Sequence, residues 1–164
     1  MNLAVIRYLA GFLVLAGLGV LAVACGDDGG AGPEALTRTF YMEAIEPKGS
    51  TSVEKEPFPD ATLPEGGGYA LEEPNAEGEW EVETYAWSPK QIIVNEGDTV
   101  KLEILGVNGA RHEGSIEGYV QSFVVERGKL TSLTFVADKA GVFKIGCATH
   151  PPSMSGELVV LPRA

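Results

Sequence analysis

From Ser88 to the C-terminus, short stretches of alternating apolar and polar residues are separated by glycine-containing turns. Such alternation is typical of β-strands that bury one face, and no stretch after the first 25 residues has a helical period. Strands are predicted over residues 91–95, 99–105, 114–119, 122–125, 130–136, 142–147 and 157–161. Short strands spaced about 8–12 residues apart indicate an all-β fold, a Greek-key sandwich or barrel.

The region before this pattern is less regular. Strands are predicted at residues 36–46 and 78–85, where apolar residues alternate in part. Residues 47–68 are rich in proline and glycine and have no period, so they are predicted to form a long surface loop. We therefore expect a β-rich N-terminal extension over residues 36–87, followed by a main domain over residues 88–164.

The N-terminal 24 residues have the pattern of a secretory signal peptide. Arg7 is the only charged residue before Asp27, and the residues between them are mostly apolar. The sequence Leu-Ala-Val-Ala before Cys25, and the polar glycine-rich stretch after it, resemble a bacterial lipobox. The resemblance implies cleavage before Cys25, a lipid on Cys25 and a flexible tether over residues 25–35.

The alternative for this segment is an uncleaved membrane anchor, because the apolar run of about 17 residues is only slightly short of a span. Either alternative places the rest of the chain on the extracytoplasmic face of a bacterial cell membrane. The net charge is −11, with 23 acidic and 12 basic residues. This surplus disfavours nucleic acid as a partner, because phosphate binding requires a basic face.

Few residues in the chain can carry redox or metal chemistry, and three of them are close together. The chain has two cysteines and two histidines. Cys147, His150 and Met154 lie within eight positions in a proline-stiffened loop between two predicted strands, and His112 lies 35 residues before Cys147. If Cys25 carries lipid, Cys147 has no internal disulfide partner, so it is buried, reactive or bound to metal.

This donor set favours copper. A thiolate with two imidazoles and a weak thioether suits an ion that cycles between Cu(I) and Cu(II). No position for a bound water is required, so the pattern indicates electron transfer rather than hydrolysis. A structural thiol at Cys147, a Cys–His nucleophile pair and a zinc site are the other interpretations.

Residues 88–161 resemble the cupredoxins, the family of blue copper proteins. Residues 141–147 with the following loop are similar to the closing strand and copper loop of plastocyanin and amicyanin. Residues 112–118 and 132–141 resemble segments of the copper domain of cytochrome oxidase subunit II. That domain's binuclear centre needs two bridging cysteines, and this loop has one, which disfavours such a centre.

The resemblance implies a cupredoxin-like fold with one copper ion. His112, Cys147 and His150 would be the equatorial ligands, and Met154 the axial ligand. The expected function is one-electron transfer by a lipid-anchored protein that is not an enzyme. The expected partner is a redox protein such as a c-type cytochrome or a terminal oxidase.

Two alternatives to electron transfer remain. Glu113-Gly114 and the Cys-x-x-His-Pro loop also resemble nitrosocyanin, a red copper protein of the same fold. In that case Glu113 would be a ligand rather than a solvent-facing or outer-shell residue, and the site could have small-molecule redox activity. The other alternative is a protein that binds or delivers copper without transferring electrons.

Overall fold

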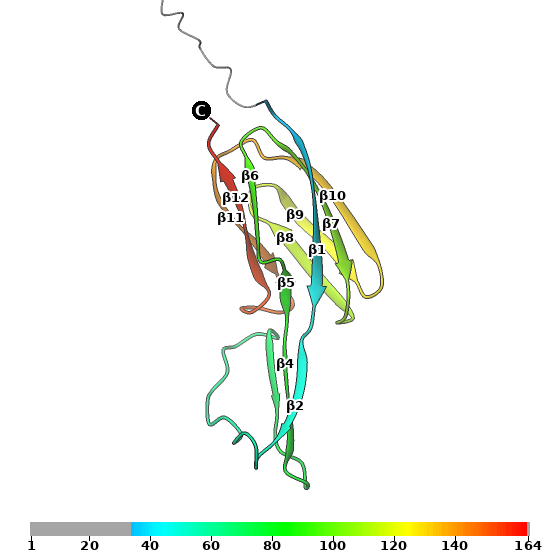
Figure 1. Cartoon of the computed structure of the whole chain (residues 1–164), viewed down its shortest axis with the longest axis vertical. Coiled ribbons are helices and arrows are strands. Elements are labelled where there is room, and N and C mark those ends of the chain that lie inside the picture. Colours follow the sequence, from blue (N-terminus) through cyan, green and yellow to red (C-terminus); the bar gives the residue numbers. More distant parts are fainter. Residues whose placement is uncertain (1–33, 164) are drawn as a thin grey trace, which may run out of the picture. The chain divides into compact units, whose positions relative to one another are not determined.

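All regular structure in the described part of the chain, residues 34–163, is β-strand (Figure 1). Over these residues, this computed structural model contains twelve strands in three sheets. Cys25 and the predicted signal peptide lie outside the described residues. Within residues 34–163 there is no helix with the length and apolar character needed to cross a membrane.

A four-stranded sheet has the strand order β10-β7-β1-β5. Its strands are β1 (Thr37–Ile45), β5 (Ala86–Ser88), β7 (Thr99–Gly106) and β10 (Leu130–Val136). β1 runs parallel to β7, with Thr37 opposite Thr99, and the other pairs are antiparallel. β1 and β5 come from the predicted N-terminal extension, yet both are strands of this sheet.

A five-stranded sheet has the order β6-β12-β11-β8-β9. Its strands are β6 (Gln91–Asn95), β8 (Arg111–Ile116), β9 (Val120–Glu126), β11 (Gly141–Cys147) and β12 (Ser155–Leu161). β6 and β12 are parallel, and the remaining pairs are antiparallel. β8 begins at Arg111, three residues before the predicted strand, so His112 lies within the strand and not before it.

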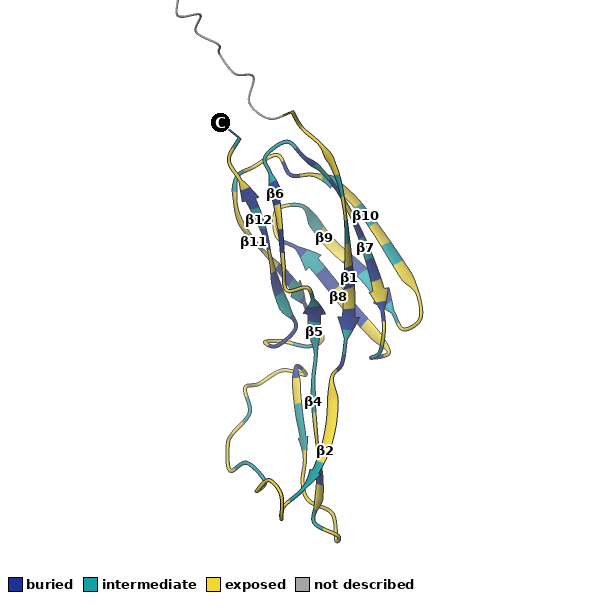
Figure 2. Cartoon of the chain, viewed as in Figure 1, coloured by how far each residue is buried: buried dark blue, intermediate teal, exposed yellow. Residues whose placement is uncertain are grey.

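The core lies between these two sheets, where each strand directs alternate residues inward. On β7, Val100, Leu102 and Ile104 are fully buried. Buried positions follow the strands of the two larger sheets, whereas β2 and β4 are largely exposed or half-buried (Figure 2). Burial of one such aliphatic side chain contributes about 1.5–3 kcal/mol, so the β7 face is a major source of stability.

A third sheet lies between β1 and β5 in the sequence. It has the order β2-β4-β3, with β2 (Lys48–Ser52), β3 (Tyr69–Glu72) and β4 (Glu79–Thr84). We call residues 46–85, which contain this sheet, the arm. The prediction of a long loop over residues 47–68 is wrong at β2, because a strand of sequence Lys-Gly-Ser-Thr-Ser has no apolar alternation to mark it.

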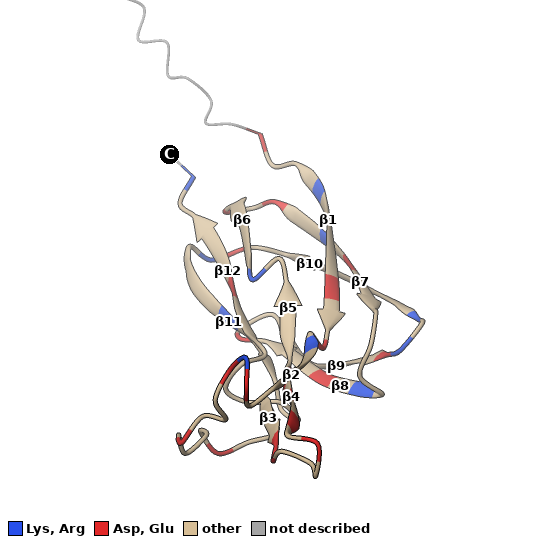
Figure 3. Cartoon of the chain, turned by 60° about the horizontal axis from the view of Figure 1, so that its bottom comes forward, with Lys and Arg blue, Asp and Glu red and all other residues tan. Residues whose placement is uncertain are grey.

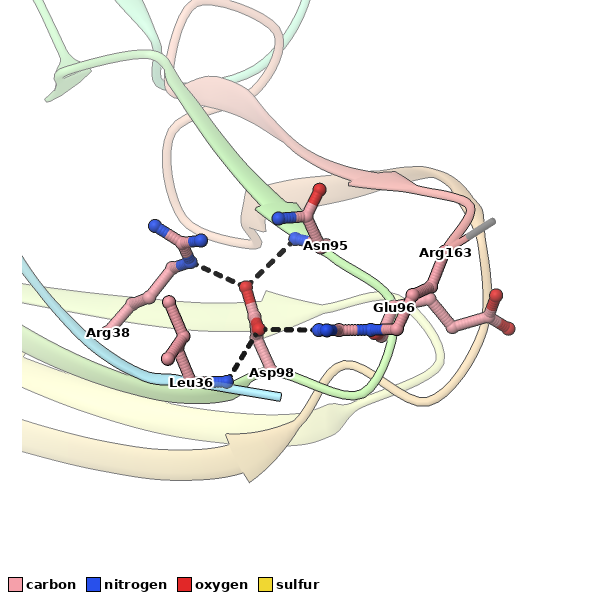
Figure 4. A network of polar contacts seen from close by, with 6 residues as sticks. All are labelled: Leu36, Arg38, Asn95, Glu96, Asp98 and Arg163. Atoms are coloured by element: carbon pink, nitrogen blue, oxygen red, sulfur yellow. Dashed lines mark hydrogen bonds and ion pairs between the residues drawn. The ribbon is translucent and has the colours of Figure 1, made fainter. Parts of the chain in front are cut away.

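A buried carboxylate fixes the two ends of the described chain to the turn between β6 and β7 (Figure 4). Asp98 is fully buried and accepts hydrogen bonds from the backbone of Leu36 at 2.9 Å and of Asn95 at 3.0 Å. It also pairs with Arg38 at 2.5 Å and with Arg163 at 2.8 Å. Burial opposes ionisation, but these donors outweigh it and hold the pKa of Asp98 far below its ordinary value.

We expect Asp98→Asn to lower the free energy of unfolding by about 3–5 kcal/mol, because two arginines lose their buried partner. Urea unfolding measures the change, with Asp138→Asn at an exposed position as the matched control. Because its folded pKa is depressed, the Asp98 contribution is present above about pH 4 and is lost as the pH falls below that value. A loss below about 1 kcal/mol, or the same acid dependence in Asp98→Asn, would contradict this account.

Candidate metal centre

His112 is the second residue of β8, and its side chain points into the core. The residue is fully buried, while its neighbours Arg111 and Glu113 are exposed, as expected from strand alternation. Its Nε2 lies 3.0 Å from the backbone oxygen of Asn108. A carbonyl oxygen can only accept a hydrogen bond, so this contact places a proton on Nε2 and leaves Nδ1 as the ring nitrogen that faces His150.

Cys147 ends β11, and His150 lies three residues later in the loop that joins β11 to β12. We call this loop, residues 148–154, the ligand loop. The Cys147 amide donates to the Met154 oxygen at 3.1 Å, and the Met154 amide donates to the His150 oxygen at 3.1 Å. These bonds close the loop into a narrow turn. The thiol and the imidazole therefore lie on the same short, hydrogen-bonded segment.

Three ligand atoms converge in this region. Single ligand atoms of His112, Cys147 and His150 all lie within 4.8 Å of one another. The two Nδ1 atoms are 3.2 Å apart, and Cys147 Sγ is 3.5 Å from His150 Nδ1. The structure thus brings together the three predicted equatorial ligands, although His112 is distant in sequence.

The charges of these groups are coupled. Burial opposes ionisation of the Cys147 thiol, but hydrogen bonds from His112 and Thr149 outweigh it and lower its pKa to about 7. For His112, burial is outweighed by the contact with Cys147, and the pKa is raised. Burial lowers the pKa of His150, and positive charge on His112 adds to this. A thiolate and a neutral His150 are the forms that bind metal.

Met154 is almost fully buried at 1% exposure. Its backbone is bonded to both Cys147 and His150, so it lies at the closing end of the ligand loop. Its assignment as the axial ligand stays a prediction.

Glu113 contributes its backbone to this region but not its carboxylate. The side chain is 53% exposed and lies 3.3 Å from Arg111 Nε. Its backbone oxygen accepts from the Ala148 amide at 2.8 Å, and its amide donates to Thr149 Oγ1 at 3.4 Å. The same hydroxyl is 3.3 Å from Cys147 Sγ. The backbone of Glu113 therefore ties β8 to the ligand loop, while its carboxylate faces the opposite side of the strand from His112.

Sequence reasoning missed the contacts that the arm makes with the ligand loop. The Tyr85 ring is stacked on the His150 ring, with centroids 3.7 Å apart and an interplanar angle of 5°. The Gly68 amide donates to the Pro151 oxygen at 3.0 Å, and Ser153 Oγ donates to the Gly68 oxygen at 2.5 Å. Three consecutive glycines at 66–68 were the available signal, because glycine permits close approach of two backbones.

Ionisation of Cys147 gives a test of this geometry. In the metal-free protein, the ultraviolet absorbance of the thiolate should rise with a midpoint near pH 7. In His112→Asn, the midpoint should move up toward the ordinary thiol value of about 8.5, because the imidazole that stabilises the thiolate is lost. Equal midpoints in the two proteins would contradict the contact between His112 and Cys147.

Comparison with known proteins identifies the fold. No protein-family model and no curated protein sequence matches the chain. Copper nitrite reductase from Nitrosomonas europaea matches with a TM-score of 0.50 and 18% identity, over 77% of this chain and 42% of that chain. The multicopper oxidase mgLAC matches with a TM-score of 0.49 and 18% identity, over 78% of this chain and 39% of that chain.

A smaller match is auracyanin A, a "blue" copper protein from Chloroflexus aurantiacus. Its TM-score is 0.40 and its identity 18%, over 46% of this chain and 88% of that chain. This chain spans about two fifths of the reductase and oxidase chains. The all-β architecture and the match to the reductase confirm the fold predicted from the sequence resemblance: the chain is a cupredoxin-like β-sandwich.

Proposed function

We propose that this protein binds one copper ion through His112, Cys147 and His150, with Met154 as a distant axial ligand. We propose that it carries single electrons on the extracytoplasmic face of a bacterial membrane, anchored by lipid on Cys25. The observation that carries the proposal is the convergence of two imidazole nitrogens and a thiol within 4.8 Å.

The residues present fit copper. The soft thiolate suits Cu(I), and the two imidazoles suit Cu(II), so the same set holds both oxidation states. Bound copper would supply the one-electron couple. Hydrogen bonds outside the donor set orient its members: Asn108 holds the His112 ring, and Thr149 contacts the Cys147 sulfur.

Burial favours electron transfer over catalysis at this site. His112 is fully buried, and Cys147 and Met154 are at most 6% exposed. A substrate would need an open coordination position, whereas an electron carrier needs ligands that remain in place.

A red copper site is the second candidate function, and it requires the Glu113 carboxylate as a ligand. That carboxylate lies on the opposite face of β8 and pairs with Arg111. It would have to leave this ion pair and turn toward the core. A copper-delivery protein would use the same donors but would release the ion readily.

The visible spectrum of the copper-loaded protein tests the proposal. We expect an intense blue thiolate-to-copper band that shifts in Met154→Leu and is unchanged in Glu113→Gln. A weaker red band that is abolished by Glu113→Gln would place this carboxylate among the ligands and favour the alternative. The absence of any thiolate band would overturn the proposal.

The proposed electron partner is a basic redox protein such as a c-type cytochrome or a terminal oxidase. Acidic residues gather along the arm and its connecting loops (Figure 3). They are Glu46, Glu54, Glu56, Asp60, Glu65, Glu72, Glu73, Glu77, Glu79, Glu81 and Glu83. The arm has two basic residues, Lys48 and Lys55, so its field would attract a cationic partner and accelerate encounter.

Electron transfer with a basic c-type cytochrome should therefore slow several-fold as the salt concentration rises from about 10 mM to about 200 mM. Stopped-flow mixing of the two proteins measures the rate. Reduction by an uncharged small reductant is the control and should not change. A rate with the cytochrome that is independent of salt would contradict electrostatic docking.

A further inference from the structure

Hydrogen bonds of its amide and its hydroxyl hold Tyr85 in its stacked contact with His150. Tyr85 is the last residue of the arm and immediately precedes β5. Its amide donates to the Gly68 oxygen at 3.0 Å, and its hydroxyl donates to the Glu46 carboxylate. With its backbone and its hydroxyl both bonded, the ring has little freedom to move away from the imidazole.

Glu46 connects this contact to the other histidine. It is only 6% exposed, and its backbone exchanges two hydrogen bonds with the Asn108 side chain, at 2.6 and 2.7 Å. The backbone oxygen of Asn108 in turn contacts His112 Nε2. A continuous series of contacts therefore runs from His150 through Tyr85, Glu46 and Asn108 to His112.

The glycines of the arm cover the ligand loop from another direction. A Cβ atom on Gly67 would lie 2.7 Å from the Thr149 oxygen, and one on Gly66 would lie 2.4 Å from the Pro151 oxygen. A Cβ on Gly68 would lie 2.5 Å from Ser153 Oγ and 2.7 Å from the His150 oxygen. The two backbones thus pack at a distance that no side chain permits.

We propose that the arm clamps the ligand loop, and that Tyr85 is its positioning residue. The clamp holds the His150 ring, through the stack, in register with the buried His112, and it closes the His150 side of the centre to external ligands. The proposal rests on the copper site proposed above. A ligand pair held in place by the protein rather than by the ion would reorganise little during electron transfer.

Two substitutions separate the ring from the hydroxyl. Tyr85→Leu removes the stack, and Tyr85→Phe keeps the ring but removes the bond to Glu46. Tyr41→Leu, at a tyrosine on β1 that is 76% exposed, is the matched control. The first measurement is the rate at which a chelator removes copper from each protein. We expect a rise of about 10–100-fold in Tyr85→Leu, the range for loss of an outer-shell partner, and a smaller rise in Tyr85→Phe.

The second measurement is binding of azide to the Cu(II) protein, followed by absorption. The parent protein and Tyr41→Leu should not respond, and Tyr85→Leu should bind azide with a new absorption band. Equal copper release and equal azide response in the parent and Tyr85→Leu would overturn the clamp. Failure of the parent itself to form a thiolate-to-copper band would instead overturn the copper site.

If Tyr85→Leu does not fold, Gly68→Ala provides the same test. Its added methyl group must displace the arm from the loop, whereas Gly49→Ala in the same arm meets only Val82 at 3.9 Å. Gly68→Ala should release copper at least 10-fold faster than Gly49→Ala. Equal rates of copper release from these two variants would overturn the proposal, whatever the result for Tyr85→Leu.

Discussion

The pairing of β8 with β11 is the interaction on which the candidate metal centre depends. It places Cys147 opposite Gly114, two residues beyond His112. A hydrogen bond from Ala148 to Glu113 continues the pairing past the end of the strand and into the ligand loop. Two donors from distant parts of the sequence therefore meet through backbone hydrogen bonds.

Gly114, the residue of β8 opposite Cys147, leaves room for an aromatic side chain in the core. A Cβ atom there would lie 2.2 Å from the ring of Phe123, a core residue of the neighbouring strand β9. The core beneath the centre is thus filled by an aromatic ring only because β8 lacks a side chain at that point. Packing and ligand placement are two consequences of the same short strand.

The buried Asp98 network and the candidate metal centre lie at different ends of β7. Asp98 precedes the strand, and Asn108, which contacts His112, follows it. Eight residues of extended strand separate them by roughly 26 Å, at about 3.3 Å per residue. The buried charge network therefore stabilises the fold without contributing to the electrostatics of the ligands.

The regular strands and the candidate ligands could be predicted from the sequence, since both have local patterns. Alternation located β7 and β10, a short apolar run located β6, and the spacing of Cys147, His150 and Met154 marked a donor loop. The arm could not be predicted in this way. β2 is polar, and the contacts of Tyr85 and Glu46 join residues that only the folded chain brings together. Such contacts require the backbone of the arm to lie close to the ligand loop. The three consecutive glycines at 66–68 are the sequence feature that indicates this closeness.

The most direct test of the account is X-ray absorption at the copper edge of the loaded protein, compared with Cys147→Ser and His112→Gln. We expect two nitrogen neighbours and one sulfur neighbour close to a single copper ion. The sulfur neighbour should be lost in Cys147→Ser, and one nitrogen neighbour should be lost in His112→Gln. A copper ion surrounded only by nitrogen and oxygen, or a signal that neither substitution changes, would contradict the claim that these residues form the metal centre.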